Sequence, residues 1–372
     1  MEPRPPNKRT GVNDTLLYYE HRKKKKCSCL GICCIICCTA IIILALVAVL
    51  LVFVGIPVVF KKSPSLQRKI VFPTNNLLPS NPEFSNFEKY DIKGARNINF
   101  TLEYIVSLSL GVWHLLPHGL VNNSLDTQNF DHSASLMQGG YPVIIHFHSN
   151  GGNRIKFIKM YNVLRTYFHV IAFDYRGYAD SSSVEPTEEG IVEDTLRLYQ
   201  WVRYQTNADI YFWGHELGAA IATHTIARLH EGEDYVVPMG LFLEAPFTSM
   251  RDQINEIPFF RKLFSWLPWY QSTILNPLDE NGFSLNTARY ITNVECPIMI
   301  VHAEDDAVTP SSFSEKLAKV AAEHLDSETK GNVTLHLLPA HFGYGHFSIH
   351  KSLELPFFIM KHITVCEAYR YI

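Results

Sequence analysis

Cysteine is scarce in most of this 372-residue sequence. Six of the eight cysteines lie within residues 27–38, which leaves only Cys296 and Cys366 for the rest of the chain. Two thiols cannot form a framework of bridges, so a disulfide-rich fold is excluded. Internal repeats are absent, and a net charge of −3 with both signs mixed argues against a nucleic-acid partner.

Charge is missing altogether from residues 27–60, where no Asp, Glu, Lys, Arg or His occurs. A membrane-spanning helix needs about 20 apolar residues, and this stretch is longer. A cleaved signal peptide is the alternative, but its apolar region is shorter, about 7–15 residues, and does not follow so long a polar leader. We therefore predict a retained transmembrane signal-anchor over residues 27–60.

The residues on either side of this stretch predict its orientation. Residues 22–26 read RKKKK, and a smaller basic group lies within residues 61–69. Because basic residues favour the cytosolic side, we expect residues 1–26 to be a cytosolic tail and the C-terminal part to lie across the membrane. N-glycosylation sequons would then be available in the lumenal part, at Asn99, Asn122 and Asn332.

The cysteines at the cytosolic end of the predicted anchor have two interpretations. Their position beside the membrane suits S-acylation, and Cys is also a small apolar residue that suits a membrane helix. Both interpretations stay open for Cys27, Cys29, Cys33, Cys34, Cys37 and Cys38.

From residue 139 onward, apolar β-branched runs alternate with helical patterns, which is typical of a mostly parallel sheet with crossover helices. We predict one domain over residues 139–366, preceded by a connector and antiparallel leading strands over residues 61–138. The predicted strands are residues 141–148, 169–175, 208–215, 239–247, 297–306 and 333–339, and the predicted helices are residues 188–205, 217–229 and 353–363.

Residues 250–292 interrupt this alternation. The segment is rich in aromatic residues, is broken by prolines, and has no obvious strand for its apolar side chains to cover. We predict a small cap over a pocket, and an ordinary surface excursion is the alternative.

The stretch YFWGHELGAA, residues 211–220, runs from a predicted strand into a predicted helix. Gly214 and Gly218 occupy the glycine positions of the nucleophile elbow Gly-x-Ser-x-Gly, where the turn is too tight for side chains. The central residue is Glu216, so the serine of the motif is absent.

Two further residues follow in the chain order of an α/β-hydrolase triad. Asp306 stands just after a predicted strand, and His346 stands in the loop after the last one. We expect Asp306 to orient His346, and His346 to face the elbow within hydrogen-bond reach of Glu216. Asp305 and His341 are rival candidates that fit the pattern less well.

Backbone donors for an oxyanion hole are expected beside the elbow. The loop HSNGGN, residues 148–153, offers the N–H of Asn150, which would pair with the N–H of Leu217. Ser149 departs from the usual His-Gly start of such a loop. The hole needs only backbone groups, although the added Cβ narrows the space for an acyl group.

Taken in series, these motifs resemble one group of enzymes. The sequence resembles the membrane-anchored lysophosphatidylserine and monoacylglycerol lipases, the α/β-hydrolase domain-containing protein twelve group. The resemblance lies in the basic N-terminus, the membrane helix and the motifs HSNGGN, FDYRGYADSS, WGHELGAA, LEAPFTSMRD, HAEDDAVTP and GYGHFSIHKSLELP. The resemblance implies an α/β-hydrolase fold with helices on both faces of the sheet. It also implies an endoplasmic-reticulum membrane protein with a lumenal serine hydrolase domain, and the bilayer and an acyl-chain lipid as partners.

The sequence departs from this group at Glu216, and the departure changes the chemistry. If a carboxylate attacked an ester, the tetrahedral intermediate would expel the carboxylate rather than an alkoxide, because a carboxylic acid has a pKa of only about 4. Enzymes of this fold that attack an sp³ carbon use Asp as the nucleophile. Glu is one methylene longer, which would displace its carboxylate by about 1.5 Å. As a general base for water, Glu216 would contribute roughly 10²–10⁴-fold. Alternatively, it forms a salt bridge with protonated His346 and plugs the site.

Two classes of function therefore stay open. One is a pseudoenzyme that keeps a lipid-sized pocket without turnover. The other is an active lysophosphatidylserine or monoacylglycerol hydrolase, as the resemblance implies, or one in which Glu216 acts as general base. We expect no cofactor and no metal ion in either case.

Overall fold

The chain forms two compact units, Met1–Val59 and Phe60–Ile372. In the computed structural model the backbone alone is described for residues 13–30 and 230. The described residues are 13–74, 79, 81–103, 107–126, 130–138, 140–230, 236–324 and 332–370.

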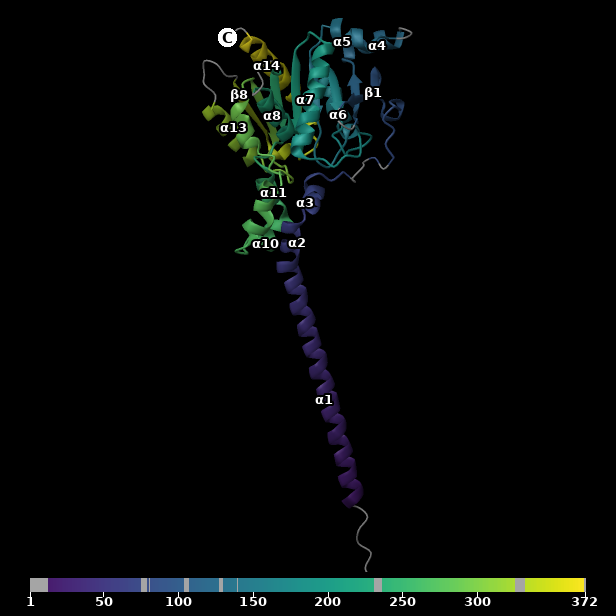
Figure 1. Ribbon diagram of the computed structural model, residues 1–372, viewed down its shortest axis with the longest axis vertical. Coiled ribbons are helices and arrows are strands. Elements are labelled where there is room, and N and C mark those ends of the chain that lie inside the picture. Colours follow the sequence, from purple (N-terminus) through teal and green to yellow (C-terminus); the bar gives the residue numbers. More distant parts are fainter. Residues whose placement is uncertain are drawn as a thin grey trace, which may run out of the picture. The chain divides into compact units, whose positions relative to one another are not determined.

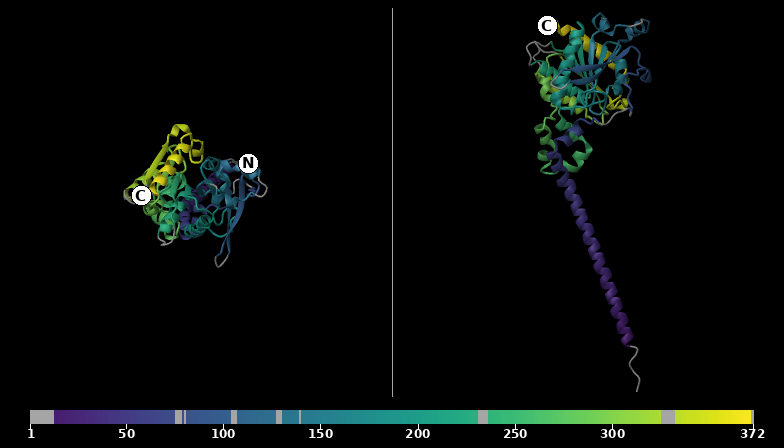
Figure 2. Two further views of the ribbon diagram at one scale, coloured as in Figure 1. Left: turned by 90° about the horizontal axis from the view of Figure 1, so that it is seen from above. Right: turned by 45° about the vertical axis from the view of Figure 1, so that its right-hand side comes forward.

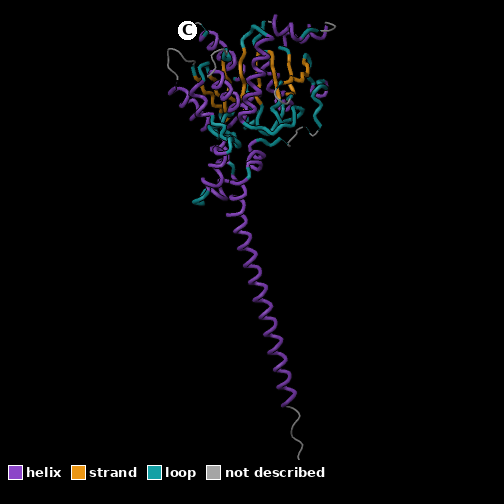
Figure 3. Tube along the Cα trace, viewed as in Figure 1, coloured by secondary structure: helices purple, strands orange, loops and turns teal. Residues whose placement is uncertain are grey.

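The first unit is built on a long helix, α1 (Asn13–Leu50), drawn in purple in Figure 3. It continues into a π-helical turn (Leu51–Gly55) and α2 (Ile56–Lys62). The stretch Gly31–Lys62 is long and apolar enough to cross a membrane, by length and composition. This is compatible with the single-pass anchor that the sequence predicts over residues 27–60.

The second unit contains an eight-stranded sheet with the order β1-β2-β4-β3-β5-β6-β7-β8 (Figure 1). β1 and β2 pair antiparallel, as do β2 and β4, and all later pairs are parallel. The strands are β1 (Ala95–Leu102), β2 (Leu108–Leu115), β3 (Val143–Phe147), β4 (His169–Phe173), β5 (Ile210–His215), β6 (Gly240–Glu244), β7 (Ile298–Ala303) and β8 (Val333–Leu338).

Burial explains why the central strands are nearly continuous apolar runs. Every residue of β3, β4, β5, β6 and β7 is buried, because helices cover both faces of a parallel sheet. The edge strand β8 is only partly buried. The predicted α/β-hydrolase fold is confirmed. All six predicted strands are present, each shorter than predicted because its ends belong to the loops.

The helices form layers on the two faces of the sheet, as the views in Figure 2 show. On one face, α8 (Leu217–His230) packs on β3, β5 and β6 and contacts α7 (Glu188–Gln205). Elsewhere α6 (Ile158–Leu164) and α14 (Leu355–Tyr369) meet at the turn Ile349–Lys351.

Several helices were not predicted from the sequence. α13 (Ser312–His324) buries Ser314, Leu317 and Ala321, a helical spacing that the sequence analysis overlooked. Before the parallel strands lie three more short helices: α3 (Pro64–Val71), α4 (His118–Asp126) and α5 (His132–Gln138).

The segment between β6 and β7 is helical. In Figure 1 its helices α10 and α11 extend beyond the ends of the strands. Phe260 and Phe264 are buried within this segment. The segment comprises α9 (Met250–Glu256), α10 (Pro258–Phe264), a π-helical turn (Gln271–Leu275), α11 (Asn276–Glu280) and α12 (Thr287–Tyr290).

A buried ion cluster joins the loop after β3 to the loop after β4. The guanidinium of Arg154 is buried, donates to Asp174, and donates to both oxygens of Asp180 at 2.6 and 2.8 Å. It also lies 3.9 Å from the ring centre of Phe84 and 5.3 Å from that of Trp113. Because Asp174 is fully buried, its charge depends on this arginine.

We predict that Arg154→Ala destabilises the folded chain by about 3–5 kcal/mol, because it leaves the carboxylate of Asp174 buried without its cationic partner. The measurement is chemical unfolding of the purified chain in detergent. Arg197→Ala is the control, since Arg197 forms an exposed pair with Glu193 at 3.1 Å. Such a pair contributes at most about 1 kcal/mol. Equal effects of the two substitutions would contradict the role given to the cluster.

Candidate active site

The turn between β5 and α8 places Glu216 at its apex. Glu216 has a φ of 52°, in the left-handed region, which costs a non-glycine residue of order 1–3 kcal/mol. Its N–H donates to the carbonyl of Glu244 on β6 at 3.0 Å, and its own carbonyl accepts from the N–H of Ala219 at 3.0 Å. A strained residue at the top of a strand–turn–helix unit is the geometry of a nucleophile elbow.

The two glycines of the elbow stand where no side chain fits. A Cβ at Gly214 would lie 2.4 Å from the carbonyl oxygen of Gly218. A Cβ at Gly218 would lie 2.1 Å from the carbonyl oxygen of Phe147 at the end of β3. The close approach of β3, β5 and α8 therefore requires glycine at both positions.

The carboxylate of Glu216 is turned into the site and only 4% of the residue is exposed. The backbone N–H of Asn150 donates to its Oε2 at 2.9 Å. Asn150 is one of the two predicted oxyanion-hole donors. The other, Leu217, is the buried first residue of α8, whose N–H has no partner within the helix. Glu216 thus supplies an internal negative oxygen to the N–H donor of Asn150, which the loop would otherwise present to a substrate.

The structure brings Asp306 and His346 together at the ends of β7 and β8. His346 Nδ1 lies 2.6 Å from Asp306 Oδ2, and both side chains are buried. The same carboxylate is 3.2 Å from His302 Nε2. Burial raises the pKa of Asp306, but its hydrogen bonds with His302 and His346 outweigh burial and hold that pKa well below the usual range. Asp306 is therefore a carboxylate that fixes the imidazole of His346.

The predicted hydrogen bond between His346 and Glu216 is wrong. Among the described residues, His346 Nε2 faces His215 instead, with 3.2 Å between the two Nε2 atoms. The reason is the length of the glutamate side chain, which carries its carboxylate past the position of a serine hydroxyl to the amide of Asn150. His215 immediately precedes Glu216 in the elbow motif. The sequence analysis did not predict that it would form part of the site.

Glu244 extends this row of polar groups on the far side of His215. Its Oε2 lies 3.3 Å from His215 Nδ1 and accepts from Trp213 Nε1 at 2.9 Å. Burial raises the pKa of Glu244, but the interactions with His215 and Trp213 reverse the shift and lower it. Two carboxylates, Asp306 and Glu244, thus bracket two imidazoles.

The rival candidates occupy other positions. Both oxygens of Asp305 accept from the N–H of Gly345 at 3.0 Å, so this residue fastens the loop that carries the histidine. His341 is exposed and its ring lies 4.2 Å from that of Phe342. Ser149 is buried, and its carbonyl contacts His148 Nδ1 at 2.7 Å.

The other predicted positions lie outside this site. The sequon residues Asn99 in β1, Asn122 in α4 and Asn332 before β8 are all exposed. Cys33, Cys34, Cys37 and Cys38 are exposed thiols, whereas the side chains of Cys27 and Cys29 fall outside the described residues. Within the described residues, no group of three or more His, Cys, Asp or Glu side chains is suited to hold a metal ion.

Comparison with known proteins agrees with this geometry. A model of the alpha/beta hydrolase fold matches residues 142–252. Lysophosphatidylserine lipase ABHD12 of Danio rerio is 32% identical over 314 residues, covering 82% of this chain and 79% of that protein. Protein ABHD12B of Homo sapiens is 28% identical over 268 residues, covering 70% of this chain and 73% of that protein.

One solved structure illustrates the fold. The alpha-beta hydrolase of Vibrio vulnificus superposes with a TM-score of 0.57 at 14% identity, covering 81% of this chain and 92% of that chain. At this identity the likeness concerns the fold alone.

We predict that Gly218→Ala lowers the stability of the chain by about 1–3 kcal/mol or more, because overpacking forces the backbone of α8 away from β3. Gly151→Ala is the matched control in the neighbouring loop, where an added Cβ meets nothing within 4 Å. The measurement is the unfolding midpoint of each variant. A midpoint of Gly218→Ala equal to that of the control would contradict the packing argument.

Proposed function

Because the chain belongs to the ABHD12 family of α/β-hydrolases, we propose that it is a membrane-anchored lipid-binding member whose ester hydrolysis is blocked by its own Glu216. Its ligands would be the lysophospholipids or monoacylglycerols of the lipase lineage. The observation that carries the proposal is the hydrogen bond from the Asn150 N–H to the carboxylate of Glu216, at 2.9 Å.

That hydrogen bond places a permanent negative charge where a transient one is needed. An oxyanion hole accelerates ester cleavage because its donors meet the oxygen on which charge develops in the transition state. Here Asn150 already donates to an internal carboxylate. A substrate carbonyl must displace that carboxylate before it can be polarised, and the displaced charge then repels the developing oxyanion.

The chemistry of the carboxylate points in the same direction. An acyl group transferred to Glu216 would form an anhydride, and the tetrahedral intermediate would expel the carboxylate in preference to the alkoxide. Each unit of pKa difference between the two leaving groups corresponds to about 1.4 kcal/mol. Glu216 is therefore a poor nucleophile toward esters even when it is correctly placed.

The other catalytic positions are intact, which supports the proposal that hydrolysis could be restored by a serine at position 216. Asp306 holds His346 through a 2.6 Å contact, and the elbow glycines are in place. A serine at the apex would have this imidazole as its general base and would free the Asn150 amide for a substrate.

The competing proposal is a working hydrolase in which Glu216 or His346 activates a water molecule. The intact contact between Asp306 and His346 favours it. It requires Glu216 to leave the amide of Asn150, and general-base catalysis alone supplies only about 10²–10⁴-fold.

We also propose a cellular location and a membrane orientation for the protein. The apolar helix Gly31–Lys62 would cross the endoplasmic-reticulum membrane once, with the basic residues before it in the cytosol. The hydrolase domain would then be lumenal. Exposure of the side chains of Asn99, Asn122 and Asn332 supports access by the glycosylation machinery in that compartment.

We predict that the purified chain hydrolyses lysophosphatidylserine and monoacylglycerol near the background rate and does not react with a fluorophosphonate probe. Glu216→Ser should label with the probe and gain at least about tenfold in kcat/KM, because it supplies a nucleophile and vacates the Asn150 donor. The gain is partial, since Ser149 narrows the acyl site. Both versions are assayed with the same ester and probe.

Two matched variants control this experiment. Glu216→Ala removes the carboxylate without adding a nucleophile, and should remain unlabelled and slow. Glu216→Ser combined with His346→Ala should lose what the serine gained. Robust turnover by the Glu216 protein that disappears in His346→Ala would falsify the blocked-site proposal and establish general-base catalysis.

We also predict that at least one of Asn99, Asn122 and Asn332 carries glycan, and that protease reaches an N-terminal tag from the cytosolic side only. Intact microsomes are treated with protease, and the product is digested with a glycosidase that removes N-linked glycan. Asn→Gln changes at the three sequons should abolish the glycosidase shift. A protected tag with a glycan-free domain accessible to protease would reverse the orientation.

A further inference from the structure

The segment between β6 and β7 has an exposed aromatic face. Within residues 258–272, buried positions recur every three or four residues, as on one side of a helix. The buried side chains are those of Phe260, Phe264, Leu267 and Tyr270. On the other side, Phe259 is 52% exposed, Trp266 is 67% exposed and Trp269 is 37% exposed. Large apolar side chains grouped on a surface mark a place where a protein, a ligand or a membrane binds.

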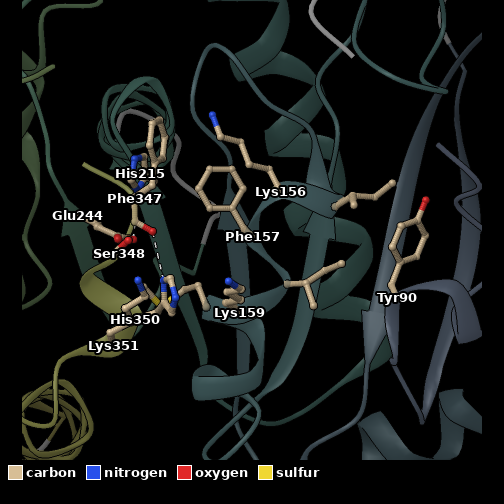
Figure 4. A pocket seen from close by; sticks show the side chains of 13 residues that line it. Tyr90, Lys156, Phe157, Lys159, His215, Glu244, Phe347, Ser348, His350 and Lys351 are labelled. Carbon is tan, nitrogen blue, oxygen red and sulfur yellow. Dashed lines mark hydrogen bonds and ion pairs between the residues drawn. The ribbon is translucent and has the colours of Figure 1, made fainter. Parts of the chain in front are cut away.

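This face is separate from the pocket beside the elbow, which has a volume of about 450 Å³ (Figure 4). The segments 155–160 and 347–351 line that pocket, together with His215 and Glu244, and its lysines are Lys156, Lys159 and Lys351. Among the described residues that line it, none belongs to residues 258–272. The exposed aromatic rings are therefore not part of the candidate active site.

The exposed face lies next to the point where the chain leaves the apolar stretch Gly31–Lys62. The second unit begins at Phe60, close to the end of that stretch. The ring centre of Phe60 lies 6.0 Å from that of Phe260 in α10, and both residues are buried. Because Lys61 directly follows Phe60, α10 is held beside the end of the apolar stretch.

A buried glutamine strengthens this connection. Gln67 in α3 is fully buried, and its Nε2 donates to the carbonyl oxygen of Phe60 at 2.7 Å. Its Oε1 accepts from Nδ2 of Asn281, just after α11, at 2.9 Å. One side chain thus bridges the chain that leaves the apolar stretch and the segment between β6 and β7.

Basic side chains accompany the aromatic ones. Lys61 and Lys62 are exposed at the end of the apolar stretch, and Arg261 and Lys262 are exposed in α10. Arg261 also pairs with Glu256 at 2.7 Å. Tryptophan is enriched at the boundary between a membrane and water. Long basic side chains extend from there to the head groups. The composition of this surface therefore suits the interface of a bilayer.

We propose that the exposed face of residues 258–272 docks on the surface of the bilayer that the stretch Gly31–Lys62 would cross. Phe259, Trp266 and Trp269 enter the boundary between head groups and acyl chains. The inference rests on the proposed membrane crossing and adds a second contact with the bilayer, made by the folded domain itself. The contact of Phe60 with α10 favours a lipid surface over a protein partner, because it keeps this face near the bilayer in every copy of the chain.

A small aromatic face is sufficient for such a contact. Interfacial binding grows with the apolar area that enters the membrane and with the attraction of basic groups to anionic lipids. The anchor would hold the domain at the bilayer, so docking is an intramolecular event at a high effective concentration. A face that would bind vesicles only weakly from solution therefore stays docked when the anchor is present.

Tryptophan fluorescence tests the contact on the full-length chain in bilayers of brominated phosphatidylcholine, because bromine on the acyl chains quenches only rings that reach them. The five tryptophans all lie in the second unit, so the anchor adds no signal. Trp113 and Trp213 are buried and Trp201 is half-buried. We expect Trp266→Phe combined with Trp269→Phe to lower the quenching by at least about twofold.

A second variant keeps both tryptophans and weakens the contact. Phe259→Ser combined with Lys262→Glu removes an exposed ring and reverses an exposed charge. It should lower the quenching by at least about twofold, since both changes oppose interfacial binding. Phe357→Ser combined with Lys361→Glu is the matched control, because both residues are exposed on α14. The control should be quenched like the wild-type chain.

Aqueous iodide is the complementary quencher. Quenching of Trp266 and Trp269 by iodide and not by brominated lipid would show that this face lies in water, and would overturn the docking. Protection of both tryptophans from both quenchers would show that a second copy of the chain covers the face, and would overturn the assignment to a lipid surface.

Extraction with alkaline carbonate separates this inference from the proposed membrane crossing. The full-length chain should stay with the membrane pellet. Its release would overturn the crossing on which the inference rests. Retention in the pellet, with tryptophans that brominated lipid does not quench, would overturn the docking alone.

Discussion

The turn at Glu216 forces three elements into contact at distances that only glycine permits. Gly218 meets the end of β3 and Gly214 meets the first turn of α8, so β5 and α8 are held close to β3, the strand with which β5 pairs. The apex residue is consequently held with a positive φ whatever its side chain is. Its side chain then points toward the loop after β3, where the carboxylate of Glu216 accepts from the N–H of Asn150.

A serine at this apex would place a hydroxyl near the histidine. The longer glutamate instead reaches the amide of Asn150 and satisfies it with a charged acceptor. His346 keeps its carboxylate partner Asp306 and turns its other nitrogen to His215. The site is therefore internally paired: every charged group that hydrolysis would use already has a partner within the protein. An α/β-hydrolase fold and a nearly complete set of catalytic positions thus coexist with the one side chain that we propose blocks the site.

Charge around the elbow is organised in two zones. Carboxylates and imidazoles alternate from Asp306 to Glu244 along the ends of the strands, buried and mutually compensated. Lysines gather beside them, on the segments that begin α6 and precede α14, with no carboxylate partner among the described residues. The charge of Glu216 counteracts the burial that lowers the pKa of Lys156.

Much of this was determined by the sequence alone. Buried parallel strands require continuous apolar runs, a tight elbow requires Gly214 and Gly218, and triad residues follow strands in a set order. The fold and the contact between Asp306 and His346 were therefore predictable, as was the apolar N-terminal helix from its uncharged run. The partners of Glu216 and the role of Glu244 were not. They depend on how far a flexible side chain reaches and on which loops meet after folding. Asn150 and Glu216, for example, are 66 residues apart in the sequence. The pocket beside the elbow likewise exists only because α6 and the segment after His346 meet at one end of the sheet. Local pattern encodes strands, helices and turns; contacts between distant side chains arise only when those elements pack together.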